Sequence, residues 1–120
     1  MQNFTLYNPT TIYFGEGQIA SLATALSKYK NILLTYGKGS IKQNGVYDQV
    51  MSQLKNHRVI EFAGIEPNPT YETLMQAVQI ARKEKVDFIL AVGGGSVVDG
   101  TKFISPKSAI PCLFINNPRD

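Results

Sequence analysis

The chain has 120 residues, a length that suits one domain with a single core. Its hydrophobic fraction of 43% and charged fraction of 18% exclude an intrinsically disordered chain. A net charge of +3 mildly favours ligands that carry phosphate. Because basic residues neither cluster nor alternate with aromatic ones, we expect no nucleic-acid partner. No apolar run approaches the roughly 20 residues that a membrane helix needs, so we expect no membrane partner.

The sequence has one cysteine, Cys112, and one histidine, His57. A lone cysteine cannot form an intrachain disulfide, which is typical of a reducing compartment. The first residues carry neither a basic segment nor an apolar one of the kind found in signal peptides, so we expect a cytoplasmic protein. A catalytic iron or zinc needs several converging ligands. We therefore expect no metal ligand and no catalytic residue in this chain.

The first third of the chain predicts short strands around one helix. Residues 4–7 and 11–14 are rich in β-forming residues and predict a hairpin or two edge strands. Helical spacing then predicts an amphipathic helix whose buried stripe is Ile19, Leu22, Ala23 and Leu26. Residues 31–35 predict a strand in which Ile32, Leu33 and Leu34 are apolar in succession, as expected of a parallel strand covered on both faces.

The rest of the chain continues the alternation of helices and strands. We expect a helix over residues 41–54, a strand over 58–62, a loop through Pro67 and Pro69, and a helix capped by Thr70. The stripe expected on that last helix is Leu74, Ala77, Val78 and Ala81. A strand over residues 86–92 and a helix running to about Ile104 should follow. The order predicts an α/β fold with a doubly wound, mostly parallel, Rossmann-like sheet and N-terminal edge strands.

A glycine-rich turn, Gly93-Gly94-Gly95-Ser96, joins the last of these strands to its helix. Glycines let a phosphate approach the backbone, and a helix N-terminus supplies unpaired N–H groups with a partial positive charge. The turn lacks the G-x-G-x-x-G spacing of common dinucleotide-binding proteins and is not a Walker A loop. A phosphate cradle and a tight turn without a ligand therefore both remain open.

A second loop, residues 35–40, also joins a strand to a helix. In a doubly wound sheet it opens on the same edge as the first. It contains no Asp or Glu to accept a ribose 2′-hydroxyl, whereas Lys38, Ser40 and Lys42 offer positive charge and a hydroxyl. These residues suit a 2′-phosphate. The alternative is a solvated turn with ordinary surface lysines.

Four ordered segments resemble the N-terminal domain of the iron-containing (group III) alcohol dehydrogenases. They are residues 4–15, 35–40, 64–69 and 91–104. Their order is similar to that of the butanol dehydrogenase-like, NADPH-dependent aldehyde reductase branch. The resemblance implies reversible hydride transfer between NADP(H) and a small alcohol or aldehyde, assisted by iron or zinc. It also leaves open a homodimer.

The resemblance assigns the cofactor pyrophosphate to Gly94, Gly95 and Ser96. It places Asp99 near the nicotinamide end of the cofactor. The alternative for Asp99 is a solvated residue in the first turn of the helix, favoured there by the helix dipole.

The resemblance assigns the adenosine ribose to Gly37, Gly39 and Ser40, and the acid-free loop implies NADP. It also places Asn68 at the cofactor cleft. The alternative for Asn68 is a turn residue chosen for local hydrogen bonding.

The resemblance ends after Ile104. Ser105-Pro106 is expected to interrupt the helix, and the residues from Phe114 onward do not continue the family pattern. We therefore expect a dinucleotide-binding domain over residues 1–104 and a divergent, truncated tail over 105–120. The helical metal-binding domain of the family, with an aspartate and three histidines as ligands, would be absent. A deletion, a shifted reading frame or trimming could each produce this.

Two functions follow from the sequence. The first is the nucleotide-binding half of an NADP-dependent oxidoreductase of this family, inactive by itself. The alternative is a non-catalytic nucleotide-binding module or remnant.

Overall fold

A computed structural model describes residues 16–37, 40–43, 45–66 and 68–116. The strands expected at residues 4–7 and 11–14 lie outside the described residues. Four parallel strands form the described sheet in the order β2-β1-β3-β4. Their bounds are Asn31–Tyr36 (β1), Arg58–Phe62 (β2), Phe88–Gly93 (β3) and Cys112–Asn116 (β4). The α/β fold and the three expected parallel strands are confirmed.

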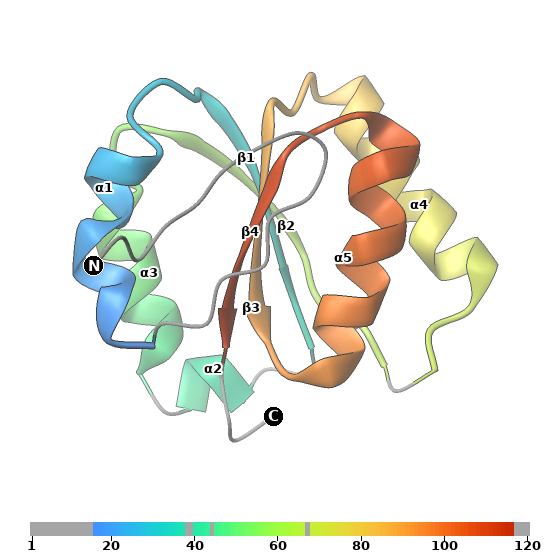
Figure 1. The fold of residues 1–120 in the computed structure, drawn as a ribbon, viewed down its shortest axis with the longest axis horizontal. Helices are drawn as coiled ribbons and strands as arrows, with labels where there is room; N and C mark the ends of the chain where they lie inside the picture. The colour runs from blue at the N-terminus through green and yellow to red at the C-terminus, as the bar shows by residue number, and fades with distance from the viewer. Residues whose placement is uncertain (1–15, 38–39, 44, 67, 117–120) are drawn as a thin grey trace.

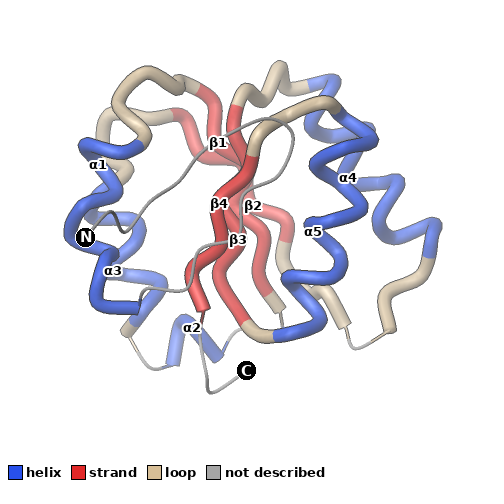
Figure 2. The backbone as a smooth tube through the Cα atoms, viewed as in Figure 1, coloured by secondary structure: helices blue, strands red, loops and turns tan. Residues whose placement is uncertain are grey.

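The helices cover both faces of this sheet (Figures 1 and 2). One face carries η1 (Glu16–Ser21), α1 (Leu22–Ala25), α2 (Ser40–Gln43) and α3 (Val46–Gln53). The other face carries α4 (Tyr71–Lys83) and α5 (Gly95–Ser108). Successive strand residues supply the two cores alternately: Ile32 and Leu34 face α1 and α3, whereas Leu33 faces α4. Burial on both faces explains why apolar residues follow one another without a break in the middle of β1 and along β3.

Helix α4 matches its prediction closely. Thr70 Oγ1 accepts a hydrogen bond from the Thr73 backbone N–H at 3.2 Å. All four residues of the expected stripe are buried: Leu74, Ala77, Val78 and Ala81. A side-chain cap together with apolar residues at helical spacing was sufficient to locate this helix.

Two other helical segments differ from expectation. The single helix expected over residues 41–54 is two helices, and Gly45 between them has φ +86°. A left-handed residue cannot continue an α-helix, so the chain turns there. The first expected helix begins as the 3-10 helix η1. Ile19, Leu22 and Leu26 are buried as predicted, whereas Ala23 is exposed, contrary to the prediction. Residues three apart share a face in a 3-10 helix, so Ile19 in η1 aligns with Leu22 rather than with Ala23, which is four residues away.

The interruption expected at Ser105-Pro106 is also wrong, because α5 continues to Ser108. Pro106 lies within the last turn of α5 and cannot donate to a carbonyl of the preceding turn, but the Pro106 and Ser105 carbonyls accept from the Ala109 and Ile110 N–H groups and close the helix end. The buried Ser105 hydroxyl donates to the Ile110 carbonyl and ties this turn to the next segment. Residues 112–116 then form β4 beside β3, so Phe114 to Asn116 do continue the sheet. The division of the chain at residue 104 into a domain and a tail stays a prediction.

No helix among the described residues is long and apolar enough to cross a membrane.

Candidate functional site

The strand order reverses direction between β1 and β3. From β1 the chain passes through α3 to β2 on one side, and later through α5 to β4 on the other. In open parallel sheets such a switch point leaves a crevice at the carboxyl ends of the strands, where ligands bind. Tyr36, the last residue of β1, lies opposite Val92 in β3. The loop beginning at Gly37 and the turn at Gly94 therefore leave the sheet side by side, as predicted.

The turn after β3 presents an open helix N-terminus. Gly94 is the N-cap of α5, and no acidic residue stands in the first helical turn. The first intrahelical bond runs from the Val98 N–H to the Gly94 carbonyl. The N–H groups of Gly95, Ser96 and Val97 come before it and have no partner within the helix. A Cβ built on Gly95 would meet nothing within 4 Å, so a ligand can approach this backbone.

Gly37 brings the first loop against the start of α5. A Cβ built on Gly37 would lie 3.5 Å from the Ile65 carbonyl oxygen and 3.7 Å from Val97 Cγ2. The Gly37 carbonyl accepts from the Gly64 N–H at 2.8 Å, and the Tyr36 carbonyl accepts from the Ile65 N–H at 3.2 Å. The segments that follow β1, β2 and β3 thus converge at one end of the sheet.

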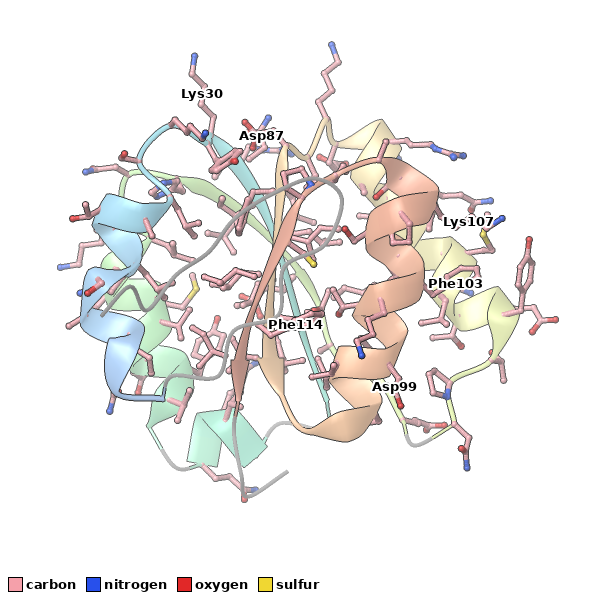
Figure 3. All side chains as sticks on the ribbon, viewed as in Figure 1. Lys30, Asp87, Asp99, Phe103, Lys107 and Phe114 are labelled. Atoms are coloured by element: carbon pink, nitrogen blue, oxygen red, sulfur yellow. The ribbon has the colours of Figure 1, made fainter. Side chains whose placement is uncertain are left out.

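For the other residues predicted to bind the cofactor, the structure describes no contact that would assign them to the site. Gly39 lies outside the described residues, and Ser40 begins α2. Asn68 is exposed with φ +53°, a conformation that asparagine tolerates in turns. Asp99 is exposed on α5, one turn beyond Gly95, and Figure 3 places it near the end of the helix that faces the crevice. The assignment of these residues to a cofactor stays a prediction.

Sequence reasoning missed a polar cluster at the same edge. Both carboxylate oxygens of Glu61 accept a tyrosine hydroxyl, Oε1 from Tyr36 and Oε2 from Tyr47, each at 2.6 Å. Lys42 Nζ lies over both rings, 5.5 Å from the centroid of Tyr36 and 4.9 Å from that of Tyr47. The four residues come from β1, α2, α3 and β2, and no local motif links them.

The cluster shifts the pKa values of its members. Burial acts to raise the pKa of Glu61, but the two tyrosine hydrogen bonds and the nearby Lys42 charge lower it below its ordinary value. Burial, reinforced by the carboxylate, raises the pKa of Tyr36 to about 12. The hydrogen bond to Glu61 is the main cause that raises the pKa of Tyr47 to about 12. At neutral pH the cluster therefore holds an anion, two neutral phenols and the Lys42 side chain.

Among the residues that the structure describes, no three His, Cys, Asp or Glu side chains gather into a group that could hold a metal ion. The His57 ring is hydrogen-bonded through Nε2 to the Leu26 carbonyl at 3.0 Å, and Cys112 is buried in β4. The described residues do not fit a catalytic iron or zinc.

Comparison with known proteins identifies the family. The family model for iron-containing alcohol dehydrogenases matches residues 9–110. The chain belongs to this family. The NADPH-dependent aldehyde reductase YqhD of Escherichia coli is 56% identical over 111 residues, which are 92% of this chain and 29% of that protein. The resemblance inferred from the four segments is thus confirmed.

Solved structures of the family share the fold. The substrate- and cofactor-free form of the aldehyde reductase YqhD from E. coli aligns with a TM-score of 0.71 and 58% identity, over 86% of this chain and 27% of that one. The NADH-dependent butanol dehydrogenase A of Thermotoga maritima aligns with a TM-score of 0.71 and 45% identity, over 87% of this chain and 27% of that one. The chain thus spans less than a third of the length of these family members.

Proposed function

We propose that this chain binds a nicotinamide dinucleotide at the carboxyl ends of β1 and β3, as the nucleotide-binding part of an alcohol or aldehyde oxidoreductase. The observation that carries the proposal is the open N-terminus of α5 at the switch point. Its first N–H groups have no intrahelical partner and its first turn has no acid. Gly95 leaves open space for a ligand. Backbone N–H groups and the helix dipole would hold the diphosphate there.

Each predicted site residue has a part in this proposal. The backbone of Gly94, Gly95 and Ser96 would contact the diphosphate, and Asp99 would lie toward the nicotinamide. Gly37, Gly39 and Ser40 would receive the adenosine ribose, with Asn68 at the margin of the cleft. When bound, the cofactor supplies or accepts the hydride. The role of the protein is to bind and orient it.

The proposed cofactor is NADP(H) rather than NAD(H). The family members compared above include one named as NADPH-dependent and one named as NADH-dependent, so similarity alone does not choose. The sequence of residues 36–40 contains no acid to accept a ribose 2′-hydroxyl, and it contains Lys38. We therefore expect the 2′-phosphate to be accepted. The expected cytoplasmic location is part of the same proposal.

Titration of the purified chain with NADPH and NADH, followed by the fluorescence of the reduced nicotinamide, tests both parts. We expect saturable one-to-one binding with a lower Kd for NADPH. Gly39→Asp should reverse the preference, because a carboxylate repels the 2′-phosphate and accepts from a 2′-hydroxyl. Gly39→Asn, of the same size but uncharged, is the control. Absence of binding would refute the proposed site, and equal Kd values would refute the preference.

Catalysis by this chain alone is a separate question. The oxidoreductase hypothesis and the non-catalytic module both predict cofactor binding, so binding does not distinguish them. We expect no turnover by the purified chain, since the described residues offer no metal-binding group. NADPH oxidation with butanal, measured with and without cell extract and together with elemental analysis, separates the two. Turnover only with extract would support an enzyme whose other half comes from a second chain, whereas turnover in neither supports the module.

A further inference from the structure

Helix α5 presents mostly small residues to the sheet. Its buried residues are Val97, Gly100, Thr101, Ile104 and Ser105. They form one helical stripe, but only Val97 and Ile104 carry sizeable apolar side chains. Because such a stripe buries little apolar surface, packing alone holds the helix weakly in one position on the sheet. The helix begins just beyond the carboxyl end of β3 (Figure 1), so a shift of α5 also moves the proposed diphosphate site.

Two buried threonines join α5 to β1. Among the described residues, the buried polar side chains are Thr35, Thr101 and Ser105. A hydrogen bond joins the hydroxyls of Thr35 and Thr101, whose oxygens lie 3.1 Å apart. Thr35 lies in β1 two residues before Gly37, and Thr101 lies in α5 about one turn after Val97. Such a bond is directional, and breaking it leaves two buried hydroxyls without a partner.

Gly37 and Val97 supply a second contact between the same two segments. A Cβ built on Gly37 would lie 3.7 Å from Val97 Cγ2. The pairs Thr35–Thr101 and Gly37–Val97 thus align the end of β1 with the first two turns of α5. Four helical residues span about 6 Å, so Thr101 lies only that far along the helix axis from Val97. The Val97 N–H is the last of the three that have no partner within the helix.

The hydrogen bond also sets the distance between α5 and β1. Two methyl groups in van der Waals contact lie about 3.5–4.0 Å apart. The hydroxyl oxygens of Thr35 and Thr101 are closer, at 3.1 Å. A pair of methyl groups in their place would therefore hold α5 roughly half an ångström farther from β1. The hydroxyls thus permit an approach that apolar side chains of the same shape do not.

From this geometry we propose that Thr35 and Thr101 are positioning residues, whose hydrogen bond sets where the open N-terminus of α5 lies relative to Gly37. The inference rests on the proposed function, because it concerns how the diphosphate site is held. Both threonines are fully buried, so they act on a ligand through the backbone of Gly95 and Ser96. The N–H groups of these two residues must meet one diphosphate, and a small displacement weakens such hydrogen bonds.

Valine substitutions test the role of the hydrogen bond. Thr35→Val and Thr101→Val each leave one buried hydroxyl without a partner, so both should lower the midpoint of urea unfolding. The double variant has no unpaired hydroxyl and should recover most of that loss. Its Kd for NADPH should nevertheless stay about tenfold above that of the unmodified chain, the loss expected for one hydrogen bond to a charged group. The Kd for NADH should rise by the same factor, since both cofactors carry the diphosphate.

Two further variants should show the opposite pattern. Thr101→Ser retains the hydroxyl and removes a buried methyl group, so we expect a lower urea midpoint but a Kd for NADPH within twofold of the unmodified value. Ser105→Ala is the matched control, because it removes a buried hydroxyl that donates to the Ile110 carbonyl near the other end of α5. It should lower the urea midpoint and change neither Kd. Circular dichroism checks that each variant is folded in the titrations.

The outcomes separate this inference from the proposed function. If the unmodified chain binds neither NADPH nor NADH, both are overturned. If it binds NADPH and the double valine variant binds equally well, the hydrogen bond is only structural and the inference alone is overturned. The inference also fails if Thr101→Ser or Ser105→Ala weakens binding as much as Thr101→Val does, because affinity would then simply follow stability.

Discussion

Two helices, α4 and α5, begin at the same edge of the sheet and satisfy their first N–H groups in different ways. At α4 the Thr70 hydroxyl caps the Thr73 N–H, and Glu72 stands in the first turn. At α5 the N-cap is Gly94, which has no side chain, and the first turn has no acid. Within the described part of the chain, the N-terminus of α4 is capped by a side chain, whereas the N-cap of α5 makes no side-chain hydrogen bond.

The difference indicates which helix start is structural and which is available to a ligand. A capped N-terminus with an acid in its first turn has its N–H groups and positive charge partly neutralised. An uncapped one retains both for an anion. Position in the fold agrees with this distinction, because α5 follows β3 at the switch point whereas α4 follows the outer strand β2.

The largest expected effect comes from closing the open N-terminus. Gly95→Asp places a carboxylate in the first turn of α5, where open space surrounds the new side chain. We expect dinucleotide affinity to fall about 100-fold, because the carboxylate repels the diphosphate, while stability rises by about 0.5 kcal/mol. Titration with NADPH and urea unfolding measure the two quantities.

Gly95→Asn separates charge from size in this experiment. It adds nearly the same volume without the negative charge, and we expect most of the affinity to remain. If Gly95→Asn and Gly95→Asp weaken binding equally, the site depends on space rather than on the helix dipole. If neither weakens binding, the diphosphate lies elsewhere.

A second, smaller effect concerns the packing that fixes α5 against α4. A Cβ built on Gly100 would lie 3.1 Å from Leu74 Cδ2 and 3.4 Å from Ile65 Cγ2, both in buried side chains. Gly100→Val should therefore lower the free energy of unfolding by about 2 kcal/mol through overpacking. Urea denaturation measures this loss. Gly95→Ala, whose Cβ would meet nothing within 4 Å, is the control and should not destabilise the protein.

The sequence predicted the parts of the molecule that local patterns encode. The apolar runs of β1 and β3, the cap and stripe of α4 and the glycine turn before α5 each depend on neighbouring residues. Helix boundaries were harder to predict where a glycine or a proline stood within a segment of helical spacing. Gly45 divides the helix expected over residues 41–54, whereas α5 continues past Pro106 to Ser108. A residue type alone does not indicate which outcome applies.

The candidate site was predictable only in its backbone portion. The glycine turns could be found from the sequence, and the structure places Gly37 and the start of α5 together. The polar cluster of Tyr36, Lys42, Tyr47 and Glu61 could not be found in this way, because its tyrosines lie 25 and 14 residues from Glu61 along the chain. Strand β4 was missed for a different reason. Leu113, Phe114 and Ile115 form an apolar run like those of β1 and β3, but these residues were interpreted as a divergent tail because they depart from the family pattern.

The smallest expected effect concerns the capped N-terminus of α4. Thr70→Ala removes the side-chain cap of α4, and we expect the free energy of unfolding to fall by about 1 kcal/mol, because the Thr73 N–H loses its acceptor. Thr70→Ser retains a hydroxyl and should recover most of this loss in urea denaturation. The Kd for NADPH should change less than twofold, since this N-terminus is assigned a structural role. If Thr70→Ala remains fully folded and yet binds NADPH clearly more weakly, the start of α4 belongs to the cofactor site. It would then favour the prediction that nearby Asn68 contacts the cofactor, and the contrast between the two helices would no longer hold.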